Sequence, residues 1–559
     1  GGILLITAAS LVAQTPVGVD ASRDSVDVAP GLHYAAGSLY RTFLGSGHRE
    51  LWTTPIRVPI ANLDTYAGGL TPVRLGGGTT TRTLHLDGAD GRRYVFRSVD
   101  KEPADLLQEF LGSPVEGVLR DQMSSFHPSG AVVVARLLDA LDVLHATPTL
   151  VVVPDDPRLG EFREEFAGML VLFEERPDDG PDGTAGFADS RRIVQTDDFF
   201  DILEEGPQHR LATDELLRAR LVDMLVGDRD RSTNNHLWAR FEDGAGGFLW
   251  RPVPRDRDQA FVQLDGFLKS LARGYEPRLV PFEDEYPNIA GLTRNAWDID
   301  RNFLVGLSRS EWTETVSDVR RRLSDPVIEG AVRRLPAAHF AVVGTELAAS
   351  LRLRRDRLDE AAEALYGIVF RFADNHATRA DETIQVERRP DGSVLVTIRP
   401  GDGSAGTFDR VFTPDETREV RIYAHGGSDE TVVTGSGTDD ITVRVVGGDG
   451  RDRFTNVSTP GSVVNFYDGG AETVVDLAPG TRFHRRHARR PFSWHEESRT
   501  LDWGRVWMPR PGFSYDADRG VTTTAGLSIV DYGFLKQPYS SRTDLSVGWA
   551  FGLAEPTID

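Results

Sequence analysis

The stretch MLVGDRDRSTNNHLW, residues 224–238, concentrates polar side chains where an apolar pattern stops. Just before it, TDELLRARLVDMLV predicts a helix over residues 213–226, with Thr213 as its N-cap. In the polar loop that follows, Asp230 and Asn235 stand five residues apart. Carboxylate and amide oxygens are ligands that hard divalent cations prefer. We therefore expect a metal site here, with a solvated, turn-forming cluster as the plainer alternative.

A second acidic cluster follows a short strand pattern. The segment FLWRPVPRDRDQAF, residues 248–261, predicts a strand that ends before Asp256 and Asp258. Two polar sites that flank a strand can converge on one cation, and their oxygen ligands suit Mg²⁺. The sequence thus predicts metal ligation by Asn235 and Asp256, with Asp258 as an equally suitable alternative to Asp256.

The region upstream offers groups that can bind phosphate. Gly76, Gly77 and Gly78 precede a run of threonines, and glycines let backbone N–H groups approach a phosphate closely, although many such triplets are simple turns. The dipeptide Asp90-Gly91 signals a hairpin between two strand patterns. Arg97 lies in the second of these, YVFRS, and Lys101 follows at its end. Either cation can bind phosphate, or it is a solvated charge at a strand end.

An acidic partner for this cation is expected on the following helix. From residue 105 to residue 144 the apolar positions recur at helical spacing, with a break at His127-Pro128. The sequence leaves three candidates open: Glu109, Glu116 and Asp121.

In chain order, these groups match what phosphoryl transfer from ATP requires: a glycine-rich cover, a cation, a carboxylate near the acceptor hydroxyl and oxygen ligands for Mg²⁺. The D-x-x-x-x-N spacing is the one with which kinase catalytic loops place their base and a metal-binding asparagine. We therefore predict Asp230 as the catalytic carboxylate and Mg²⁺ with ATP as the cofactors.

Composition narrows the possible partners. The 559 residues carry 63 Lys and Arg against 85 Asp and Glu, a formal net charge of −22 that repels a phosphate backbone, so we expect no nucleic-acid partner. With no cysteine, neither disulfides nor thiolate metal sites contribute. The first residues, GGILLITAASLVAQTP, are similar to the apolar core and cleavage end of a secretory signal, with an ordinary strand as the alternative.

The sequence pattern changes near residue 381, where short strand patterns begin to alternate with Gly/Asp turns. The glycine pairs that begin at residues 426, 447 and 469 recur at similar intervals, as in stacked β-coils. The turn GGDGRD resembles those of calcium-binding β-rolls, and its Ca²⁺ candidates are Asp429, Asp439, Asp449 and Asp452. The turns are few and their spacing drifts, so a metal-free solenoid or sandwich is favoured.

The last segment, VTTTAGLSIVDYGFLKQPYSSRTDLSVGWAFG, alternates polar and apolar residues, which is typical of outer-membrane barrel strands. About sixty residues cannot form the eight strands of the smallest barrel, so we expect a truncated barrel or a soluble hairpin. The basic run RFHRRHARRP, residues 482–491, precedes it and would face anionic lipid or the periplasmic mouth of a barrel, unless it is a solvated linker.

These patterns predict a multidomain chain with an α+β atypical-kinase-like domain, a β-rich solenoid or sandwich module and the start of a truncated outer-membrane β-barrel. The expected boundaries are a signal-peptide remnant over 1–15, an N-terminal linker or extension over 16–69, the kinase-like domain over 70–375, the β-rich module over 380–485 and the barrel start over 490–559.

The motifs GDRDRSTNNHLW and VPRDRDQAF resemble atypical kinases, namely type II phosphatidylinositol 4-kinases and spore-coat CotH kinases. Together with LGGGTTTRTLHL and YVFRSVDKEP, they resemble more closely a family of large bacterial envelope proteins that join a kinase-like region to a C-terminal BamA/TamA-type surface-antigen barrel. The resemblance covers nearly the whole chain. It implies Asp230 as the catalytic aspartate and Asn235 and Asp256 as metal ligands; the chain departs from the family at Ser232, where a bulkier residue is expected.

The leading hypothesis is therefore an envelope protein of the periplasm or outer membrane with a Mg·ATP-dependent phosphotransferase fold, acting on an unidentified acceptor. Because ATP is not normally available in the periplasm, a second hypothesis stands beside it. This is an outer-membrane assembly or secretion component whose kinase-like region only binds a protein partner.

Overall fold

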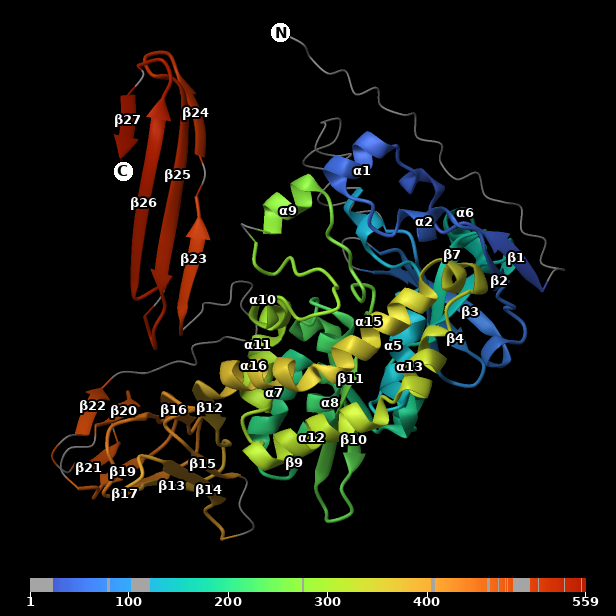
Figure 1. The fold of residues 1–559 in the computed structure, drawn as a ribbon. Coiled ribbons are helices and arrows are strands. Elements are labelled where there is room, and N and C mark those ends of the chain that lie inside the picture. Colours follow the sequence, from blue (N-terminus) through green and yellow to red (C-terminus); the bar gives the residue numbers. More distant parts are fainter. Residues whose placement is uncertain are drawn as a thin grey trace.

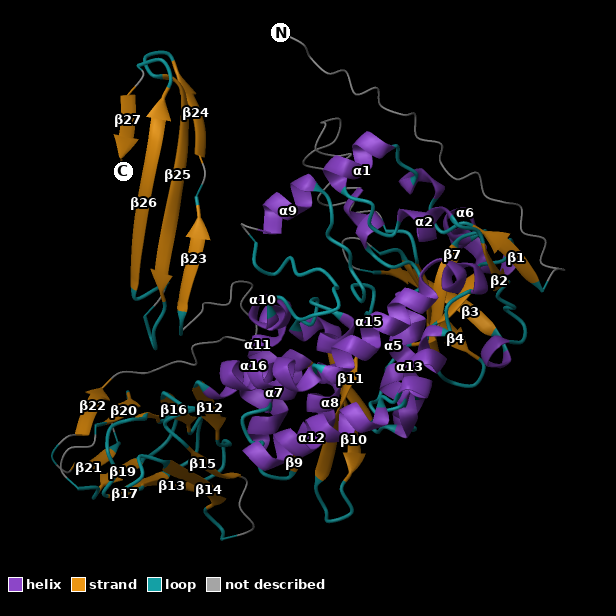
Figure 2. Ribbon diagram, in the orientation of Figure 1, coloured by secondary structure: helices purple, strands orange, loops and turns teal. Residues whose placement is uncertain are grey.

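The structure is a computed structural model. It describes residues 24–77, 81–101, 121–273, 276–403, 408–459, 463–470, 472–477, 479, 481–485, 503–510, 512–536, 538–553 and 555–558. The chain is a multidomain α/β protein with several separate sheets (Figure 1). Most helices gather in the middle of the molecule, and sheets lie around them (Figure 2). The expected signal segment, residues 1–15, lies outside the described residues.

The first large sheet has five antiparallel strands in the order β3-β4-β5-β7-β6. The hairpin expected at Asp90-Gly91 is confirmed, because β4 pairs with β5 and Gly91 turns the chain with a φ of 82°. Leu84 and Phe96 bury one face of this sheet in its own apolar cluster. The strands are β3 Leu70–Gly76, β4 Thr83–Gly88, β5 Arg93–Ser98, β6 Thr149–Val152 and β7 Leu170–Glu175.

Residues 24–69 are an extension that packs onto this sheet. Strand β1 (Ser25–Val28) pairs with β2 (Ile56–Pro59), and helices α1 (Ser38–Leu44) and α2 (Arg49–Thr53) lie between them. Side chains of α2 and β2 share an apolar cluster with those of β6 and β7. Apolar packing therefore joins residues 24–69 to the first sheet.

The helical region is built around α8 (Thr213–Val226), which is buried along nearly its whole length. Helices α5, α12, α15 and α16 pack against it. Thr213 is not the N-cap: the helix begins at Thr213 itself, after Ala212, and the Thr213 hydroxyl donates to the carbonyl of Leu211 at 3.4 Å instead of accepting from a helix amide.

Helices also make up most of the chain from Asn288 to Ala373. The bounds are α5 Gly130–Asp139, α6 Arg163–Phe166, α7 Thr196–Glu205, α9 Phe267–Arg273, α10 Ile289–Thr293, α11 Trp297–Phe303, α12 Arg309–Arg322, α13 Asp325–Val332, α14 Ala337–His339, α15 Thr345–Asp356 and α16 Leu358–Phe370.

A second, four-stranded sheet follows α8, in the order β8-β10-β11-β9. Its central hairpin joins β10 (His236–Glu242) to β11 (Phe248–Pro254), with β8 (Arg192–Gln195) and β9 (His209–Leu211) at the edges. The sequence indicated β11 but not β10, whose HLWARFE follows the polar loop directly. The hairpin brings the loop before β10 beside the segment after β11.

The β-rich module forms parallel two-sheet coils from β16 onward, as in a solenoid, whereas β14 pairs antiparallel with β13 and β15. From β16 onward the chain alternates between the sheets β12-β16-β18-β20-β22 and β15-β14-β13-β17-β19-β21. The strands are β12 Phe372–His376, β13 Glu382–Arg388, β14 Val394–Pro400, β15 Phe408–Phe412, β16 Glu419–Tyr423, β17 Glu430–Gly435, β18 Thr442–Val446, β19 Arg453–Asn456, β20 Val464–Asp468, β21 Val474–Leu477 and β22 Thr481–Arg485.

The last sheet is antiparallel, in the order β23-β25-β26-β27, with β24 also paired to β25. Its strands are β23 Arg505–Pro509, β24 Gly512–Asp516, β25 Gly520–Asp531, β26 Ser541–Ala550 and β27 Glu555–Ile558. Much of the basic run, residues 486–491, lies outside the described residues. Among the helices that the structure describes, none has the length and apolar character needed to cross a membrane.

Candidate active site

The loop after α8 places Asp230 and Asn235 close together. Gly227 ends the helix in the left-handed region, with a φ of 69°. The side-chain amide of Asn235 donates to the backbone carbonyl of Asp230 at 2.7 Å, which closes the loop. Neither the half-buried carboxylate of Asp230 nor the amide oxygen of Asn235 has a hydrogen-bond partner among the described residues. Both side chains therefore keep oxygen atoms for a ligand.

The β10/β11 hairpin brings Asp256 to the same place. His236 pairs with Pro254 across the hairpin, and the amide of Arg255 donates to the carbonyl of Asn235 at 3.1 Å. The next residue, Asp256, has a φ of 57°, a left-handed conformation that is uncommon for a residue other than glycine. This backbone turn directs the chain away from β11 immediately beside Asn235.

Arg97 on β5 forms an ion pair with Asp256 and lies 3.5 Å from a carboxylate oxygen of Glu174 on β7. Burial acts to raise the pKa of Asp256, but the charges of Arg97 and Lys101 outweigh it and hold that pKa well below its usual range. Asp256 is therefore ionised at any pH near neutrality. The strand cation and the expected metal ligand thus meet directly.

Lys101 occupies a similar position beside Asp258, with which it forms an ion pair. Burial lowers the pKa of Lys101, while the nearby carboxylates of Asp256 and Asp230 act in the opposite direction. The other carboxylate oxygen of Asp258 is buried and has no hydrogen-bond partner among the described residues. That unpaired atom is the kind of group a bound cation would satisfy.

The glycine triplet is only partly described. Gly76 is the last residue of β3, and Gly77 has a φ of 126°, a conformation that favours glycine, whereas Gly78 lies outside the described residues. A β-carbon on Gly77 would lie 2.1 Å from the carbonyl oxygen of Thr81, so this position requires glycine for its turn.

Of the three acidic candidates on the following helix, the structure describes only Asp121, which does not pair with Arg97. Asp121 binds Arg49 at 2.6 Å, and both side chains are buried. The other two candidates, Glu109 and Glu116, lie outside the described residues. The acidic neighbour that the structure places beside Arg97 is Glu174, on the adjacent strand. Sequence reasoning missed it because strand pairing between β5 and β7 joins residues far apart in the chain.

Beneath these groups lies a buried charge network that the sequence analysis also missed. Arg231 lies 3.2 Å from Asp228 and 3.7 Å from Asp223, and Arg257 pairs with the same two carboxylates. Burial raises the pKa of Asp228, whereas at Asp223 the charges of Arg257 and Arg231 outweigh burial and lower the pKa. The alternation D-R-D-R in the sequence was the available signal, since buried carboxylates require charged partners.

The oxygen donors fit a Mg²⁺ ion in their chemistry. Asn235, Asp256 and Asp258 supply an amide oxygen and two carboxylates, and Mg²⁺ commonly takes only one or two protein carboxylates and completes its shell with water and phosphate. No group of three or more His, Asp or Glu side chains arranged to hold a metal occurs in the described part of the chain. These three side chains would therefore fill only part of the coordination shell of a bound metal.

The calcium candidates of the solenoid are arranged differently. Asp429 and Asp452 are buried, and each accepts a backbone N–H, from Glu382 at 2.9 Å and from Asp429 at 3.2 Å. Asp439 accepts from the amide of Val463 at 2.5 Å, and Asp449 is exposed. Burial raises the pKa of Asp429 to about 8. The inward carboxylates link successive coils.

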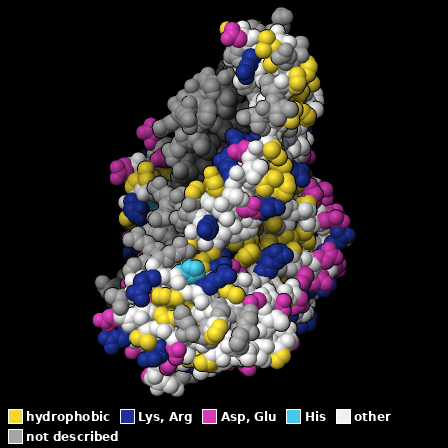
Figure 3. Space-filling model, turned by 90° about the vertical axis from the view of Figure 1, so that its left-hand side faces the viewer, with side chains coloured by type: hydrophobic (Ala, Val, Ile, Leu, Met, Phe, Trp, Pro, Cys, Tyr) yellow, Lys and Arg dark blue, Asp and Glu magenta, His cyan; other side chains and the backbone are white. Residues whose placement is uncertain are grey.

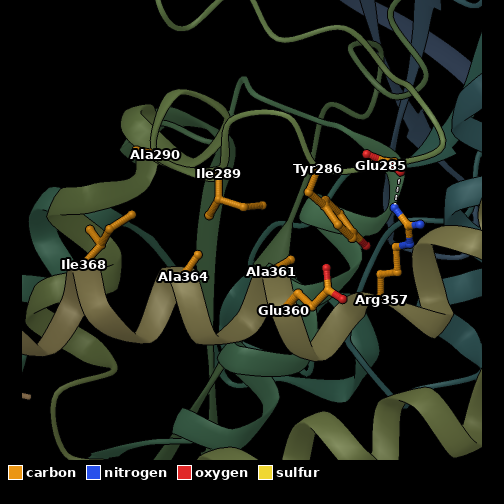
Figure 4. A pocket seen from close by; sticks show the side chains of 9 residues that line it. All are labelled: Glu285, Tyr286, Ile289, Ala290, Arg357, Glu360, Ala361, Ala364 and Ile368. Carbon is orange, nitrogen blue, oxygen red and sulfur yellow. Dashed lines mark ion pairs between the residues drawn. The ribbon is translucent and has the colours of Figure 1, made fainter.

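A hollow of about 410 Å³ lies elsewhere, between α10 and α16 (Figure 4). Small side chains of α16 form its floor, and an ion pair between Glu285 and Arg357 stands at one end. None of the candidate site residues lines it. The lining residues are Glu285, Tyr286, Ile289, Ala290, Arg357, Glu360, Ala361, Ala364 and Ile368.

Comparisons with known proteins give little beyond the structure itself. No protein-family model matches the chain, and no curated protein is similar to it in sequence. Among solved structures, the chain aligns with the proinflammatory kinase CtkA of Helicobacter pylori at 11% identity and a TM-score of 0.29, over 53% of this chain and 95% of that one. Values this low do not establish a common fold.

Proposed function

We propose that the chain is a Mg·ATP-dependent phosphotransferase of atypical kinase-like architecture. The observation that carries the proposal is the meeting of three distant segments: the Asp230–Asn235 loop, Asp256 after β11, and Arg97 on β5. Each supplies a group that phosphoryl transfer needs, namely a free carboxylate, oxygen ligands for a metal, and a cation for the phosphates. The ion pair between Arg97 and Asp256 joins the first sheet to the hairpin.

In this proposal Asp230 accepts the proton of the acceptor hydroxyl, whose oxygen attacks the γ-phosphorus as the bond to the bridging oxygen of ADP breaks. Asn235 and Asp256, with Asp258, would hold Mg²⁺, which would neutralise the negative charge of the phosphates. Arg97 and Lys101 would bind the phosphates. At Ser232, where the chain departs from the family, the backbone carbonyl accepts from the His236 ring at 3.0 Å.

Thermal unfolding of the full chain with and without Mg·ATP tests this proposal. A ligand that binds only the native state stabilises it by about 2.7 kcal/mol at a concentration one hundred times its Kd. We expect a metal-dependent rise in Tm that Asp256→Ala abolishes. Asp409→Ala removes an exposed carboxylate of the solenoid and should leave the rise intact. If millimolar Mg·ATP produces no shift, the chain is instead a scaffold that binds a protein partner.

A second proposal concerns the last sheet and rests on the alternation of its side chains. On β26, Leu545, Val547 and Trp549 are all at least 43% exposed, and Leu545 and Val547 pair across the sheet with Leu527 and Ala525 of β25. Hydrophobic side chains gather over this upper part of the molecule (Figure 3). The residues that alternate with them on β26 are Ser546, Gly548 and Ala550.

An exposed apolar face backed by small or polar residues is the pattern of a strand between lipid and a polar interior. We propose that this sheet contacts the outer membrane as barrel strands do, which would put the chain in the cell envelope. Flotation with lipid vesicles tests it: Leu545→Asp should weaken co-flotation, whereas Ser546→Asp, on the other face of the same strand, should not. Equal flotation of the two variants would contradict a lipid-facing side.

A further inference from the structure

Arg231 contacts both segments that carry the candidate metal ligands. Its side chain is 1% exposed. One terminal nitrogen, Nη1, donates to the backbone carbonyls of Arg255 and Asp256, both at 2.9 Å. The other, Nη2, donates to the carbonyl of Asn235 at 2.8 Å. A single guanidinium therefore fixes the backbone of Asn235 to that of Asp256.

The guanidinium is itself held from the other side. Nη1 also donates to the carboxylate of Asp228 at 3.2 Å, and Nε lies 3.7 Å from Asp223 near the end of α8. Helix α8 is buried along nearly its whole length, so Arg231 connects the candidate site to the interior of the helical region. A planar, forked guanidinium can bind several acceptors in fixed directions, which an ammonium cannot do.

The hydrogen bond from Arg231 to the carbonyl of Asp256 supports a left-handed backbone conformation. A non-glycine residue in this conformation is unfavourable by about 1–2 kcal/mol and persists only when its surroundings hold it. The carbonyl that Arg231 binds belongs to Asp256 itself, so the hydrogen bond stabilises the turn that aims this side chain at Arg97 and at the site.

We propose that Arg231 is a positioning residue that sets the distance between Asn235 and Asp256 and thereby the affinity of the site for Mg²⁺. The inference rests on the proposed function, since it concerns the metal of the same site. Arg231 touches neither nucleotide nor acceptor in this account; it acts through the two backbone segments that it joins.

Arg257 provides a matched control within the same charge network. It is buried and pairs with Asp223 and Asp228, as Arg231 does, yet it donates to no backbone carbonyl among the described residues. Replacing either arginine by lysine keeps the charge and removes the fork. If only charge balance mattered, the two substitutions would have the same effect on the metal.

In the experiment, Mg²⁺ is titrated into the full chain at a fixed concentration of a fluorescent ATP analogue, whose fluorescence reports binding. Urea unfolding measures the stability of each variant. We expect Arg231→Lys to raise the Mg²⁺ concentration at half-saturation about 10- to 100-fold, the range typical of lost outer-shell contacts. Arg257→Lys should change it less than about 3-fold at a similar loss of stability. Nucleotide affinity without Mg²⁺ should be the same in both variants.

The outcomes separate the two proposals. If the unsubstituted chain binds no Mg·ATP, the proposed function fails. If it binds, and Arg231→Lys has the Mg²⁺ dependence of Arg257→Lys, the positioning role alone is overturned. Should Arg231→Lys not fold, Asp228→Ala removes the carboxylate behind Nη1, and we expect a several-fold rise in the Mg²⁺ requirement; an unchanged requirement there also overturns the inference.

Discussion

The candidate active site and the solenoid both concentrate aspartates at turns, yet they use them in opposite ways. At the candidate site, Asp256 is paired with Arg97, and its pKa is held well below the usual range. In the solenoid, Asp429 has no cationic partner among the described residues and accepts a backbone N–H, and burial raises its pKa to about 8. The two clusters contain the same residue type, and what distinguishes the candidate ligand site from the structural turns of the solenoid is the presence of cationic partners.

The largest effect is expected from Asp230→Asn. Removal of a general base typically costs about 100- to 10,000-fold in rate, and we expect a loss of turnover in that range with the Kd for Mg·ATP nearly unchanged. Single-turnover transfer from labelled ATP, with binding measured in parallel, checks this. Equal loss of binding and turnover would show that Asp230 is needed to form the site, not to accept a proton.

Arg97→Met tests how the cationic partner of Asp256 affects ligand binding. Without the guanidinium, Arg97 no longer competes with Mg²⁺ for the carboxylate of Asp256. We therefore expect the affinity for Mg²⁺ without nucleotide to rise about tenfold, which corresponds to about 1.4 kcal/mol. Affinity for ATP should fall by a similar factor. Calorimetric titrations with each ligand separately measure both; changes of the same sign would refute competition between Arg97 and the metal.

Asp429→Asn tests the solenoid through pH. A carboxyl whose pKa is raised to about 8 in the fold, from an unfolded value near 3.9, stabilises the fold fully below about pH 4 and loses that contribution as pH rises through 8. Asparagine does not ionise, so Asp429→Asn should not lose stability in this way. We expect its free energy of unfolding, relative to that of the parent chain, to increase by about 2 kcal/mol between pH 5 and pH 8.5.

Hydrogen exchange of β17 and β19 at several pH values provides the measurement, because these strands flank the buried carboxylates. Asp439→Asn is the control, since Asp439 is more exposed. A parent chain whose solenoid is equally protected at pH 5 and pH 8.5 would contradict the buried, protonated carboxyl.

The smallest effect is expected from Asp449→Ala. This exposed side chain has no partner among the described residues, and such substitutions usually change stability by less than about 0.5 kcal/mol. The melting temperature with and without Ca²⁺ checks both this and the calcium hypothesis. A Ca²⁺-dependent rise that Asp449→Ala removes would show that the solenoid turns bind the ion after all.

Local patterns predicted much of the fold. The apolar periodicity of residues 213–226 gave α8, and the Asp90-Gly91 signal gave the β4/β5 hairpin. The repeated glycine pairs predicted stacked coils without choosing between solenoid and sandwich. Strand β10 was missed because its first residues follow a polar loop, and Thr213 was misassigned as a cap because propensity does not fix a boundary to one residue.

For the candidate site, residue types and spacing pointed to Asp230, Asn235 and Asp256, and the structure brings all three together. Glu174 could not be found in this way, and for Arg231 the D-R-D-R alternation signals buried carboxylate partners but not its backbone contacts. Glu174 approaches Arg97 only through the pairing of β5 with β7, and Arg231 acts through backbone carbonyls that carry no sequence signal. Contacts of this kind depend on tertiary packing, which a single sequence does not display.

Equilibrium dialysis of the full chain against labelled ATP, with Mg²⁺ and then with excess chelator, tests the central claim most directly. The account predicts saturable, stoichiometric binding of ATP with Mg²⁺. Excess chelator should lower the affinity for ATP at least about tenfold, because the metal would link the phosphates to the side chains of the site. The Asp256→Ala chain should show only the weaker binding under both conditions. Absence of binding with Mg²⁺, or binding that Asp256→Ala leaves untouched, would contradict a nucleotide site at this hairpin.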